Sequence, residues 1–474
     1  MNARLKYWLG TTLDLLETCA CPRHWGRVSE MRQRFRGIQS WRQDRYYHQR
    51  IFHEWYPAKE KEIREKMRQK RPVRVGFFVS EPSKWSCDSL YKALHQHDAF
   101  EAVVCVFPQV QRGLPLKKRY SRKDFSTHNA RIENHRSFAE SYEENIRFYT
   151  ERGCSVLRGF NVGRRCYESL SFFRNLDIVF LEQPWPIIPP DISVLSLSRQ
   201  SLVCYIPYGF MSAGGIENFQ YNLDLHNFAW RNFVETHWHK EQYTKYGKRN
   251  GENVVALGYP KLDAYVYPTE KPADKIWKSG LNPNVRRVVW APHWSVAKDI
   301  IVLFSLFKET YREILNYARK TPQVDWLFKP HPLLYQEIIH RGIMSTEETD
   351  AYYHEWAQLP NGQVCFDGGY MDYFKTSDAL ITDSVSFLIE YLPTRKPILR
   401  LLSEKNLGLN DFTNRIVQSH YQAKDMEGIH EFLSQVVKPC SDPRYDIRMQ
   451  GLAELLNVGR AGQEIVQYLV QQFS

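Results

Sequence analysis

From residue 73 onward, short apolar runs alternate with segments of helical pattern. The first run, residues 73–79, is rich in valine and phenylalanine and ends in a Ser-Glu-Pro-Ser turn. A helical segment at 89–97 and a second apolar run at 102–107 follow. Parallel strands need a crossover between them, usually a helix, so this alternation is typical of a parallel sheet. The rhythm predicts a doubly wound α/β fold.

The same rhythm occurs twice along the chain. In the first half we expect helices at 141–152 and 167–174, strands at 155–160, 177–181 and 202–206, and a basic loop at 109–135. In the second half we expect strands at 288–291, 325–328, 364–366, 379–382 and 397–401, helices at 301–318 and 387–392, and mainly helix from 425 onward. Two such series predict two Rossmann-like domains that face a cleft.

The length of the chain agrees with this division. A chain of 474 residues is too long for one ordinary core and suits two domains with an appendage. We expect a basic helical extension at 1–72, a first domain at 73–260 and a second domain at 261–474. Mixed charges at i,i+4 spacing over 54–70 indicate a solvated helix. Apolar residues at helical spacing over 5–16 fit a helix that lies on a membrane or packs on the protein.

The net charge and the absence of several motifs exclude some classes of protein. The net charge is +11, and much of the excess lies between Arg23 and Arg74, which favours nucleic acid, an anionic membrane or phosphorylated substrates as partners. The nine cysteines form no zinc-ligand spacing, and neither a D-x-D triplet nor a GxxxxGK[ST] loop occurs. No apolar run approaches the ~18 residues that span a bilayer. We therefore predict a cytosolic protein with no metal site and no cofactor.

Two imidazole-bearing clusters follow expected strands of the second half. His293 and Ser295 come directly after the strand at 288–291, and Lys329 and His331 come after the strand at 325–328. The carboxyl ends of parallel strands meet at one edge of a sheet, where α/β proteins bind their ligands. A single histidine after a strand is more often structural than catalytic, but the joint placement favours a phosphate-binding site.

A third cluster follows the strand at 379–382 and leads into a helix. It supplies Asp383, Ser384 and Ser386, whose hydroxyls and nearby backbone N–H groups suit a phosphate at a helix N-terminus. Glu390 lies one to two turns further on, within reach of a ribose hydroxyl of the same nucleotide. An Asp-Ser pair before a helix is often only an N-cap, so this cluster gains weight from the other two.

The ordered elements GYPKLD, APHWS, FKPHP and SDALITDSVSFLIE resemble the C-terminal half of the CDP-glycerol glycerophosphotransferases. That family includes teichoic-acid polymerases and capsule transferases, and its pattern reads approximately GYPRxD, APTW, KPHP and SDxLITDYSSxxFD. The resemblance covers roughly residues 175–400. It implies a GT-B fold whose second domain holds most of the donor nucleotide.

The resemblance also implies roles for single residues. His331 matches the family histidine that contacts the donor phosphates, and Ser384 and Ser386 fall in the hydroxyl-bearing turn. Glu390 falls where the family has an acidic residue, and a similar acid binds ribose in many GT-B enzymes. His293 stands where the family commonly has threonine. Lys329, His331 and helix N-termini would then stabilise the leaving phosphate without a metal.

The chain departs from the family at the acceptor-activating position. The family has a WHG-type turn whose histidine is taken as the base, and here Tyr208 occupies that place. A tyrosine with an ordinary pKa of about 10 is a poor base at neutral pH. Either Tyr208 binds donor or acceptor and another group takes the proton, or the reaction differs. Glu182, after the strand at 177–181, is one candidate base, and His226 and His237 are others.

These observations favour a transferase that moves glycerol phosphate, or a related group, from a nucleotide-activated donor to a cell-surface saccharide or lipid-linked acceptor. We expect it at the inner face of a bacterial membrane, in contact with anionic lipid. The alternatives are a GT-B glycosyltransferase that uses a nucleotide sugar in capsule or lipopolysaccharide synthesis, and a non-catalytic scaffold of such a complex. Nucleic acid is not an expected partner, because no RNA- or DNA-binding signature occurs.

Overall fold

The computed structural model describes residues 44–108, 138–185, 192–280, 282–296, 304–366, 369–403, 408–437 and 442–474. The expected N-terminal helix at 5–16 and the basic loop at 109–135 lie outside these ranges. Among the helices within them, none combines the length and the apolar character that a membrane crossing requires.

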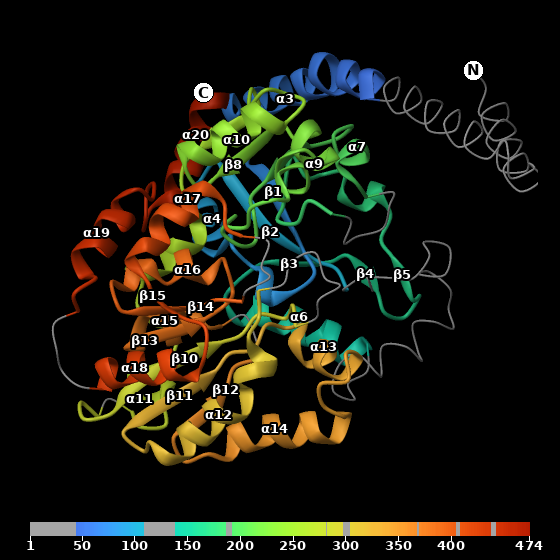
Figure 1. The fold of residues 1–474 in the computed structure, drawn as a ribbon. Helices are drawn as coiled ribbons and strands as arrows, with labels where there is room; N and C mark the ends of the chain where they lie inside the picture. The colour runs from blue at the N-terminus through green and yellow to red at the C-terminus, as the bar shows by residue number, and fades with distance from the viewer. Residues whose placement is uncertain are drawn as a thin grey trace, which may run out of the picture.

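Seven parallel strands form the sheet of the first domain (Figure 1). They are β1 (Val73–Val79), β2 (Phe100–Val106), β3 (Val156–Arg158), β6 (Ile178–Leu181), β7 (Leu202–Tyr205), β8 (Arg231–Val234) and β9 (Val254–Ala256). Their order is β3-β2-β1-β6-β7-β8-β9, so the order reverses between β1 and β6. That reversal point is where a doubly wound sheet opens a crevice for ligands.

Six parallel strands form the second sheet in the same manner. They are β10 (Arg286–Ala291), β11 (Val324–Phe328), β12 (Gly362–Val364), β13 (Ala379–Thr382), β14 (Ile398–Leu401) and β15 (Tyr421–Ala423). Their order is β12-β11-β10-β13-β14-β15, and it reverses between β10 and β13. The GT-B-like prediction of two doubly wound domains is therefore confirmed.

Helices cover both sheets (Figure 1). Those of the first domain are η2 (Ile51–Trp55), α3 (Tyr56–Arg68), η3 (Pro82–Lys84), α4 (Asp88–His95), α6 (Phe138–Glu151), η5 (Leu170–Phe173), α7 (Val194–Leu197), α8 (Glu217–Tyr221), α9 (Asp224–Phe228) and α10 (His237–Tyr246). Those that follow are η6 (Pro260–Val266), α11 (Ala273–Ile276), α12 (Phe307–Lys320), α13 (Leu334–His340), α14 (Thr346–Gln358), α15 (Met371–Thr376), α16 (Phe387–Glu390), η7 (Leu392–Thr394), α17 (Asp411–Ile416), η8 (Val417–Ser419), α18 (Met426–Val437), α19 (Tyr445–Ala453) and α20 (Ala461–Phe473).

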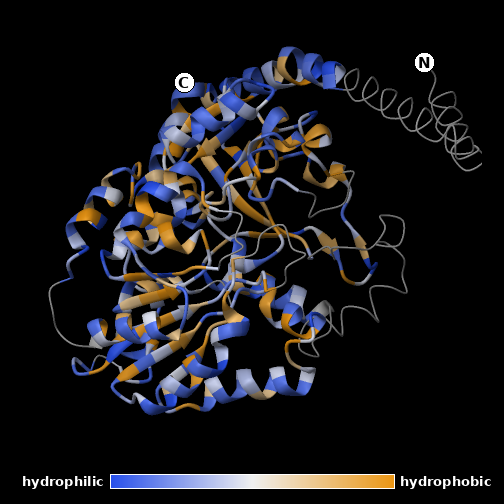
Figure 2. Ribbon diagram, viewed as in Figure 1, coloured by the Kyte–Doolittle hydropathy of each residue, from blue (hydrophilic) through white to orange (hydrophobic). Residues whose placement is uncertain are grey.

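The strands carry most of the apolar sequence, and Figure 2 shows it as orange in the middle of each domain. Phe77 of β1 stacks on Phe180 of β6 with ring centroids 5.1 Å apart. In the second domain, Trp290 of β10 and Trp356 of α14 are fully buried. Strands covered on both faces read as continuous apolar runs, which explains why the sequence predicted β1 and β13 residue for residue.

Two local predictions need correction. The helix expected at 167–174 does not form, because the chain instead makes a short hairpin of β4 (Phe160–Asn161) and β5 (Cys166–Tyr167) and the 3₁₀ turn η5. The helix over 54–70 is also not simply solvated. Ile51, Tyr56 and Ile63 are buried in the first core, and the Tyr56 hydroxyl donates to the Phe228 carbonyl at 2.8 Å.

The last helix crosses back to the first domain. Side chains of α20, including Ile465 and Leu469, join the first core, and Figure 1 shows α20 in red beside the blue α3. Asp263 fixes the start of α20, because its two carboxylate oxygens accept the N–H groups of Ala461 at 2.9 Å and Gly462 at 2.8 Å. The segment assigned to a second domain at 261–474 therefore ends in a helix that packs with the first.

Candidate functional site

Both sheets present polar side chains at the carboxyl edge, next to the point where strand order reverses. In the second sheet these are the residues after β10, β11 and β13, and in the first sheet they are the residues after β1, β6 and β7. We call these two groups the second edge and the first edge. Residues from the two edges contact one another across the domains, as described below.

Two histidines lie side by side at the second edge. The ring centroids of His293 and His331 are 5.2 Å apart, and the His331 N–H donates to the Pro292 carbonyl at 3.1 Å. Each ring accepts a backbone N–H from two residues further along the chain: His293 Nδ1 from Ser295 at 3.2 Å and His331 Nδ1 from Leu333 at 3.1 Å. An Nδ1 that accepts leaves the ring proton of the neutral imidazole on Nε2. Both rings therefore present an Nε2–H donor.

Burial reinforces the neutral form of one ring. Desolvation by the surrounding protein lowers the pKa of His293 to about 3. The Ser295 hydroxyl lies 2.7 Å from His293 Nδ1 and accepts the Phe304 N–H at 2.9 Å, so it orients the imidazole and anchors the following segment. Neutral imidazole N–H groups of fixed direction are suited to hydrogen-bond a phosphate oxygen.

The Asp383 carboxylate links two backbone segments of the second edge. One carboxylate oxygen accepts the His293 N–H, and the other accepts the Leu306 N–H at 2.9 Å. Burial raises the pKa of Asp383 to about 7, and the two backbone donors oppose that rise. In the structure this carboxylate positions the loop that carries His293. Its predicted donor contact stays a prediction.

Ser384 and Ser386 lie in the turn between β13 and α16. The Ser384 N–H donates to the Thr382 hydroxyl at 2.9 Å, and Ser386 precedes the first helical residue. Because α16 has only four residues, its macrodipole is much smaller than that of a full helix. The predicted contact of Ser384 and Ser386 with a donor phosphate stays a prediction.

A ring and two lysines connect the second edge to the first. The Tyr370 ring lies between Lys261 Nζ, 5.1 Å from its centroid, and Lys329 Nζ, 5.4 Å from it. The Tyr370 hydroxyl donates to Glu390 at 2.6 Å, and Lys261 Nζ lies 3.8 Å from the same carboxylate oxygen. The cluster joins two ammonium groups and one carboxylate, and Lys329 lies two residues before His331.

Glu390 contacts the first domain directly. Its other carboxylate oxygen accepts the Phe210 N–H at 3.3 Å, and the residue is 1% exposed. Lys261 Nζ also donates to the Tyr208 carbonyl at 3.3 Å. Glu390 thus serves as a cross-domain anchor, and binding of a ribose hydroxyl, which stays a prediction, requires it to exchange one of these partners.

Glu182 lies at the first edge directly after β6, and it is 3% exposed. One carboxylate oxygen accepts both the backbone N–H of Ser86 at 2.7 Å and its hydroxyl at 2.8 Å. Burial raises the pKa of Glu182 to about 7, although Ser86, Cys87 and the positive charge of Lys261 oppose the rise. A carboxyl with a pKa near the working pH suits general base catalysis.

Tyr208 lies beside Glu182. Its N–H donates to the Glu182 carbonyl at 3.1 Å, and its ring packs edge-on against Trp185 with centroids 5.6 Å apart. Lys84 Nζ lies 5.6 Å from the centroid of the same ring. The structure brings Tyr208, Glu182 and, through Lys261, Glu390 into one neighbourhood.

The two other histidines considered as bases sit elsewhere. His226 is buried, its Nδ1 accepts the Leu223 N–H at 3.1 Å, and burial lowers its pKa to about 3. It therefore caps α9. His237 begins α10 and is exposed.

The sequence missed three contributors to this site. Lys261 and Tyr370 build the charged cluster, and Ser86 holds Glu182. Lys261 belongs to the GYPKLD element, so the sequence contained a motif that could have identified it. The aspartate of that element, Asp263, is now explained as the cap of α20 rather than as a ligand residue. Tyr370 and Ser86 have no sequence signal of their own.

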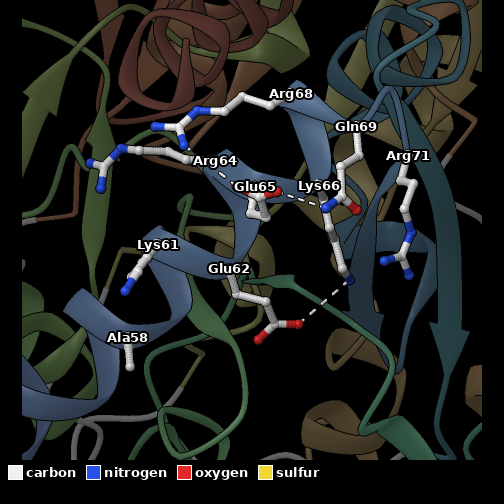
Figure 3. A pocket seen from close by; sticks show the side chains of 9 residues that line it. All are labelled: Ala58, Lys61, Glu62, Arg64, Glu65, Lys66, Arg68, Gln69 and Arg71. Atoms are coloured by element: carbon white, nitrogen blue, oxygen red, sulfur yellow. Dashed lines mark hydrogen bonds and ion pairs between the residues drawn. The ribbon is translucent and has the colours of Figure 1, made fainter.

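A hollow of about 760 Å³ lies along α3, away from both edges. Figure 3 shows its lining of Ala58, Lys61, Glu62, Arg64, Glu65, Lys66, Arg68, Gln69 and Arg71. Lys66 also binds Asp177, which precedes β6, so the hollow faces the amino edge of the first sheet. Within the described ranges, no group of three or more histidine, cysteine, aspartate or glutamate residues is placed to hold a metal ion.

The two doubly wound parallel sheets define a GT-B-like fold. Solved structures share this fold, among them an assigned UDP-N-acetylglucosamine 2-epimerase from Listeria monocytogenes at 12% identity and a TM-score of 0.51, covering 85% of this chain and 97% of that one. A UDP-GlcNAc 2-epimerase from Methanocaldococcus jannaschii matches at 11% identity, a TM-score of 0.51 and coverages of 84% and 99%. At these identities the likeness concerns the fold.

A variant of the wall teichoic acid polymerase TagF with CDPG matches at 12% identity and a TM-score of 0.51, over 92% of this chain and 98% of that one. Residues 216–406 match the model of the family described as CDP-Glycerol:Poly(glycerophosphate) glycerophosphotransferase. This segment of the chain is therefore similar to the CDP-glycerol glycerophosphotransferases. A comparison with curated protein sequences gave no match.

Proposed function

We propose that this protein transfers glycerol phosphate from CDP-glycerol to a hydroxyl of a cell-surface polymer or its lipid-linked precursor. The observation that carries the proposal is the pair of Nε2–H donors on His293 and His331, within the segment that matches the glycerophosphotransferase model. Two such donors, with Lys329 two residues before His331, are suited to the two phosphates of a nucleoside diphosphate.

In the proposed reaction, an acceptor oxygen attacks the phosphorus that bears glycerol. A bond forms between that oxygen and phosphorus, and the bond from phosphorus to the bridging oxygen breaks, so that CMP leaves with the electron pair. Glu182 accepts the acceptor proton, and its raised pKa of about 7 supports this role. His331, His293 and the lysines stabilise the charge on the leaving phosphate, while Tyr208 positions the acceptor.

One observation favours a second candidate. Tyr208 replaces the family histidine, so the acceptor side differs from that of the family pattern. A glycosyltransferase that uses a nucleotide sugar would need the same diphosphate contacts from the second edge. The two candidates differ in the donor group next to the second phosphate, and donor binding separates them.

A thermal-shift screen tests the donor. A ligand that binds only the folded protein raises Tm, and at 100 times Kd it adds about 2.7 kcal/mol to the free energy of unfolding. We expect stabilisation by CDP-glycerol and CMP, little by UDP-sugars or GDP-sugars, and loss of the shift in His331→Ala. His340→Ala, a histidine at the end of α13, is the control. A shift with UDP-sugars alone supports the glycosyltransferase, and no shift with any nucleotide contradicts both candidates.

We further propose peripheral contact with the inner face of a bacterial membrane. Of the net charge of +11, residues 1–72 supply +9, from 17 lysines and arginines against 8 acidic residues. The basic side chains that line the hollow, with Lys61 of α3 and Arg71 after it among them, support an approach to anionic lipid, where each charge contributes about 1 kcal/mol. Nucleic acid is not a proposed partner.

Vesicle sedimentation tests this contact. We expect binding to vesicles with anionic phosphatidylserine, weak binding to neutral phosphatidylcholine, and loss of binding in a Lys61→Glu and Arg71→Glu double variant. Lys308→Glu with Lys320→Glu, on α12 of the second domain, is the matched control. Equal binding to both vesicle types would contradict an electrostatic contact.

A further inference from the structure

An aromatic cluster with a polar rim lies at the first edge, beside Glu182. Trp185 and Phe219 stack with ring centroids 5.5 Å apart and an interplanar angle of 15°, and Tyr208 packs edge-on against Trp185. Phe219 is 47% exposed. Surface aromatic residues that gather next to a catalytic group mark a contact for a ligand with an apolar face.

The rim of the cluster consists of Glu81, Lys84 and Gln183. Lys84 forms an ion pair with Glu81 and donates to the Gln183 side-chain oxygen at 2.9 Å. The Trp185 indole N–H donates to the same oxygen at 3.1 Å. The rim therefore joins a carboxylate, an ammonium and an amide next to the rings, and its net charge is zero.

The topology explains why these residues meet. Glu81 and Lys84 follow β1, Gln183 and Trp185 follow β6, and Tyr208 follows β7. These three strands are neighbours in the order β1-β6-β7, so the residues after them share one edge. Glu182 directly precedes Gln183, and therefore the proposed base and the cluster lie side by side.

We infer that this cluster is the acceptor subsite and that it binds a neutral sugar ring. The inference rests on the proposed function, in which Glu182 takes the acceptor proton. A pyranose has an apolar face of C–H groups that packs on aromatic rings, and hydroxyls that exchange hydrogen bonds with carboxylate, amide and ammonium groups. A glycerol phosphate end offers no such face.

The charges around the cluster also favour a neutral sugar over a phosphate-bearing acceptor. Lys84 of the rim is already paired with Glu81, and Lys261, which donates to the Tyr208 carbonyl, lies 3.8 Å from a Glu390 carboxylate oxygen. A phosphate-bearing acceptor therefore gains little attraction there. An ionised Glu182 would repel it at short range. The acceptor nucleophile is therefore a sugar hydroxyl, and the chain adds its group to a saccharide rather than extending a polyglycerol phosphate.

Saturation-transfer NMR on the full chain tests this without any donor. The probes are the methyl glycosides of a hexose and of an N-acetylhexosamine, with glycerol 3-phosphate as competitor. We expect saturation of the sugar C–H protons, at least a threefold loss of signal in Phe219→Ala and Trp185→Ala, and no change in His331→Ala. Phe172→Ala is the matched control, because Phe172 is 46% exposed and its ring packs on Phe173 of η5.

Phe219→Ala keeps the test valid if Trp185→Ala fails to fold, since Phe219 is largely exposed. The inference is overturned if neither glycoside binds, if glycerol 3-phosphate binds in preference, or if the Phe219 variant binds sugars as the wild type does. These results are independent of the donor screen. Donor binding without sugar binding contradicts only the acceptor subsite, whereas failure of the donor screen contradicts the proposed function.

Discussion

The two edges share a topology but differ in how their chemistry is built. At the second edge, His293 and His331 follow adjacent strands. In each of them the ring Nδ1 accepts the backbone N–H of the residue two positions later in the chain. At the first edge, one buried acid, Glu182, is held by Ser86 next to an aromatic cluster. The second edge thus presents ring N–H donors, and the first presents a buried carboxyl beside an aromatic cluster.

This difference indicates a division of labour. The proposed donor is a nucleoside diphosphate, and the residues proposed to meet it lie in short sequence elements that follow strands. Acceptors differ, and the first edge departs from the family at Tyr208. We therefore expect variants of the second edge to weaken donor binding and variants of the first edge to slow transfer.

The largest effect is expected for Glu182→Gln. Glutamine keeps a side-chain oxygen that can accept from Ser86 but has no basic carboxylate, so transfer from CDP-glycerol should slow by about 100- to 10,000-fold with donor affinity unchanged. The measurement is CMP release under single-turnover conditions. Glu151→Gln, an exposed position at the end of α6, is the control. A loss below fivefold would remove Glu182 as the base.

A smaller effect on rate should follow loss of a histidine. His331→Ala should reduce transfer by about 100-fold and His293→Ala by about 10-fold or more, because each removes one preorganised N–H from the phosphate charge. His293→Thr, which restores the residue common in the family, should recover part of the loss. Calorimetric titration with CDP-glycerol measures the affinity. Unchanged affinity in both alanine variants would break the proposed role of the second edge.

The two edges can face each other only if the domains stay linked, and Asp263 contributes to that link. Asp263→Ala removes the acceptor for Ala461, Gly462 and Ser89 and leaves buried donors unpaired. We expect a loss of about 3 to 4 kcal/mol in the free energy of unfolding. Urea denaturation measures it, with the exposed Asp274→Ala as control. A change like that of the control would mean that α20 is held by packing alone.

The raised pKa of Glu182 should also affect how the stability of the protein depends on pH. The folded protein keeps the Glu182 proton up to a pKa of about 7, whereas the unfolded chain loses it near the ordinary value. The folded state therefore binds more protons in between, and this contribution to stability falls as pH rises from about 4.5 to 7. Glu182→Gln removes the fall, so its stability relative to wild type should increase by up to about 3 kcal/mol over that range. A constant difference would mean that Glu182 has an ordinary pKa.

The second sheet was largely predictable, because its buried strands are continuous apolar runs. Residues 379–382 were predicted exactly where β13 lies, whereas the strand expected at 364–366 lies two residues earlier as β12. The strands β8, β9 and β15 were missed, because half of β8 is polar (Arg231 and Asn232) and β9 and β15 have only three residues each, so none forms an apolar run like that of β13. The helix expected at 167–174 failed because a hairpin and a 3₁₀ turn depend on local backbone bonds that apolar spacing does not report.

The site was predicted in part for a similar reason. His293, His331 and Asp383 follow strands, and the sheet order brings them together. Lys261 was passed over because its partners, Tyr208, Tyr370 and Glu390, lie 53 to 129 residues away in the chain. The packing of α20 on the first domain could not be predicted from the sequence either, because an amphipathic helix does not specify which core it covers.

The most direct test of the division of labour measures affinity for CDP-glycerol and single-turnover CMP release in the same two variants. The account predicts that Glu182→Gln binds the donor as the wild type does but barely releases CMP in the presence of acceptor. It predicts that His331→Ala binds the donor at least tenfold more weakly. Equal loss of affinity in both variants, or normal turnover in Glu182→Gln, would contradict it.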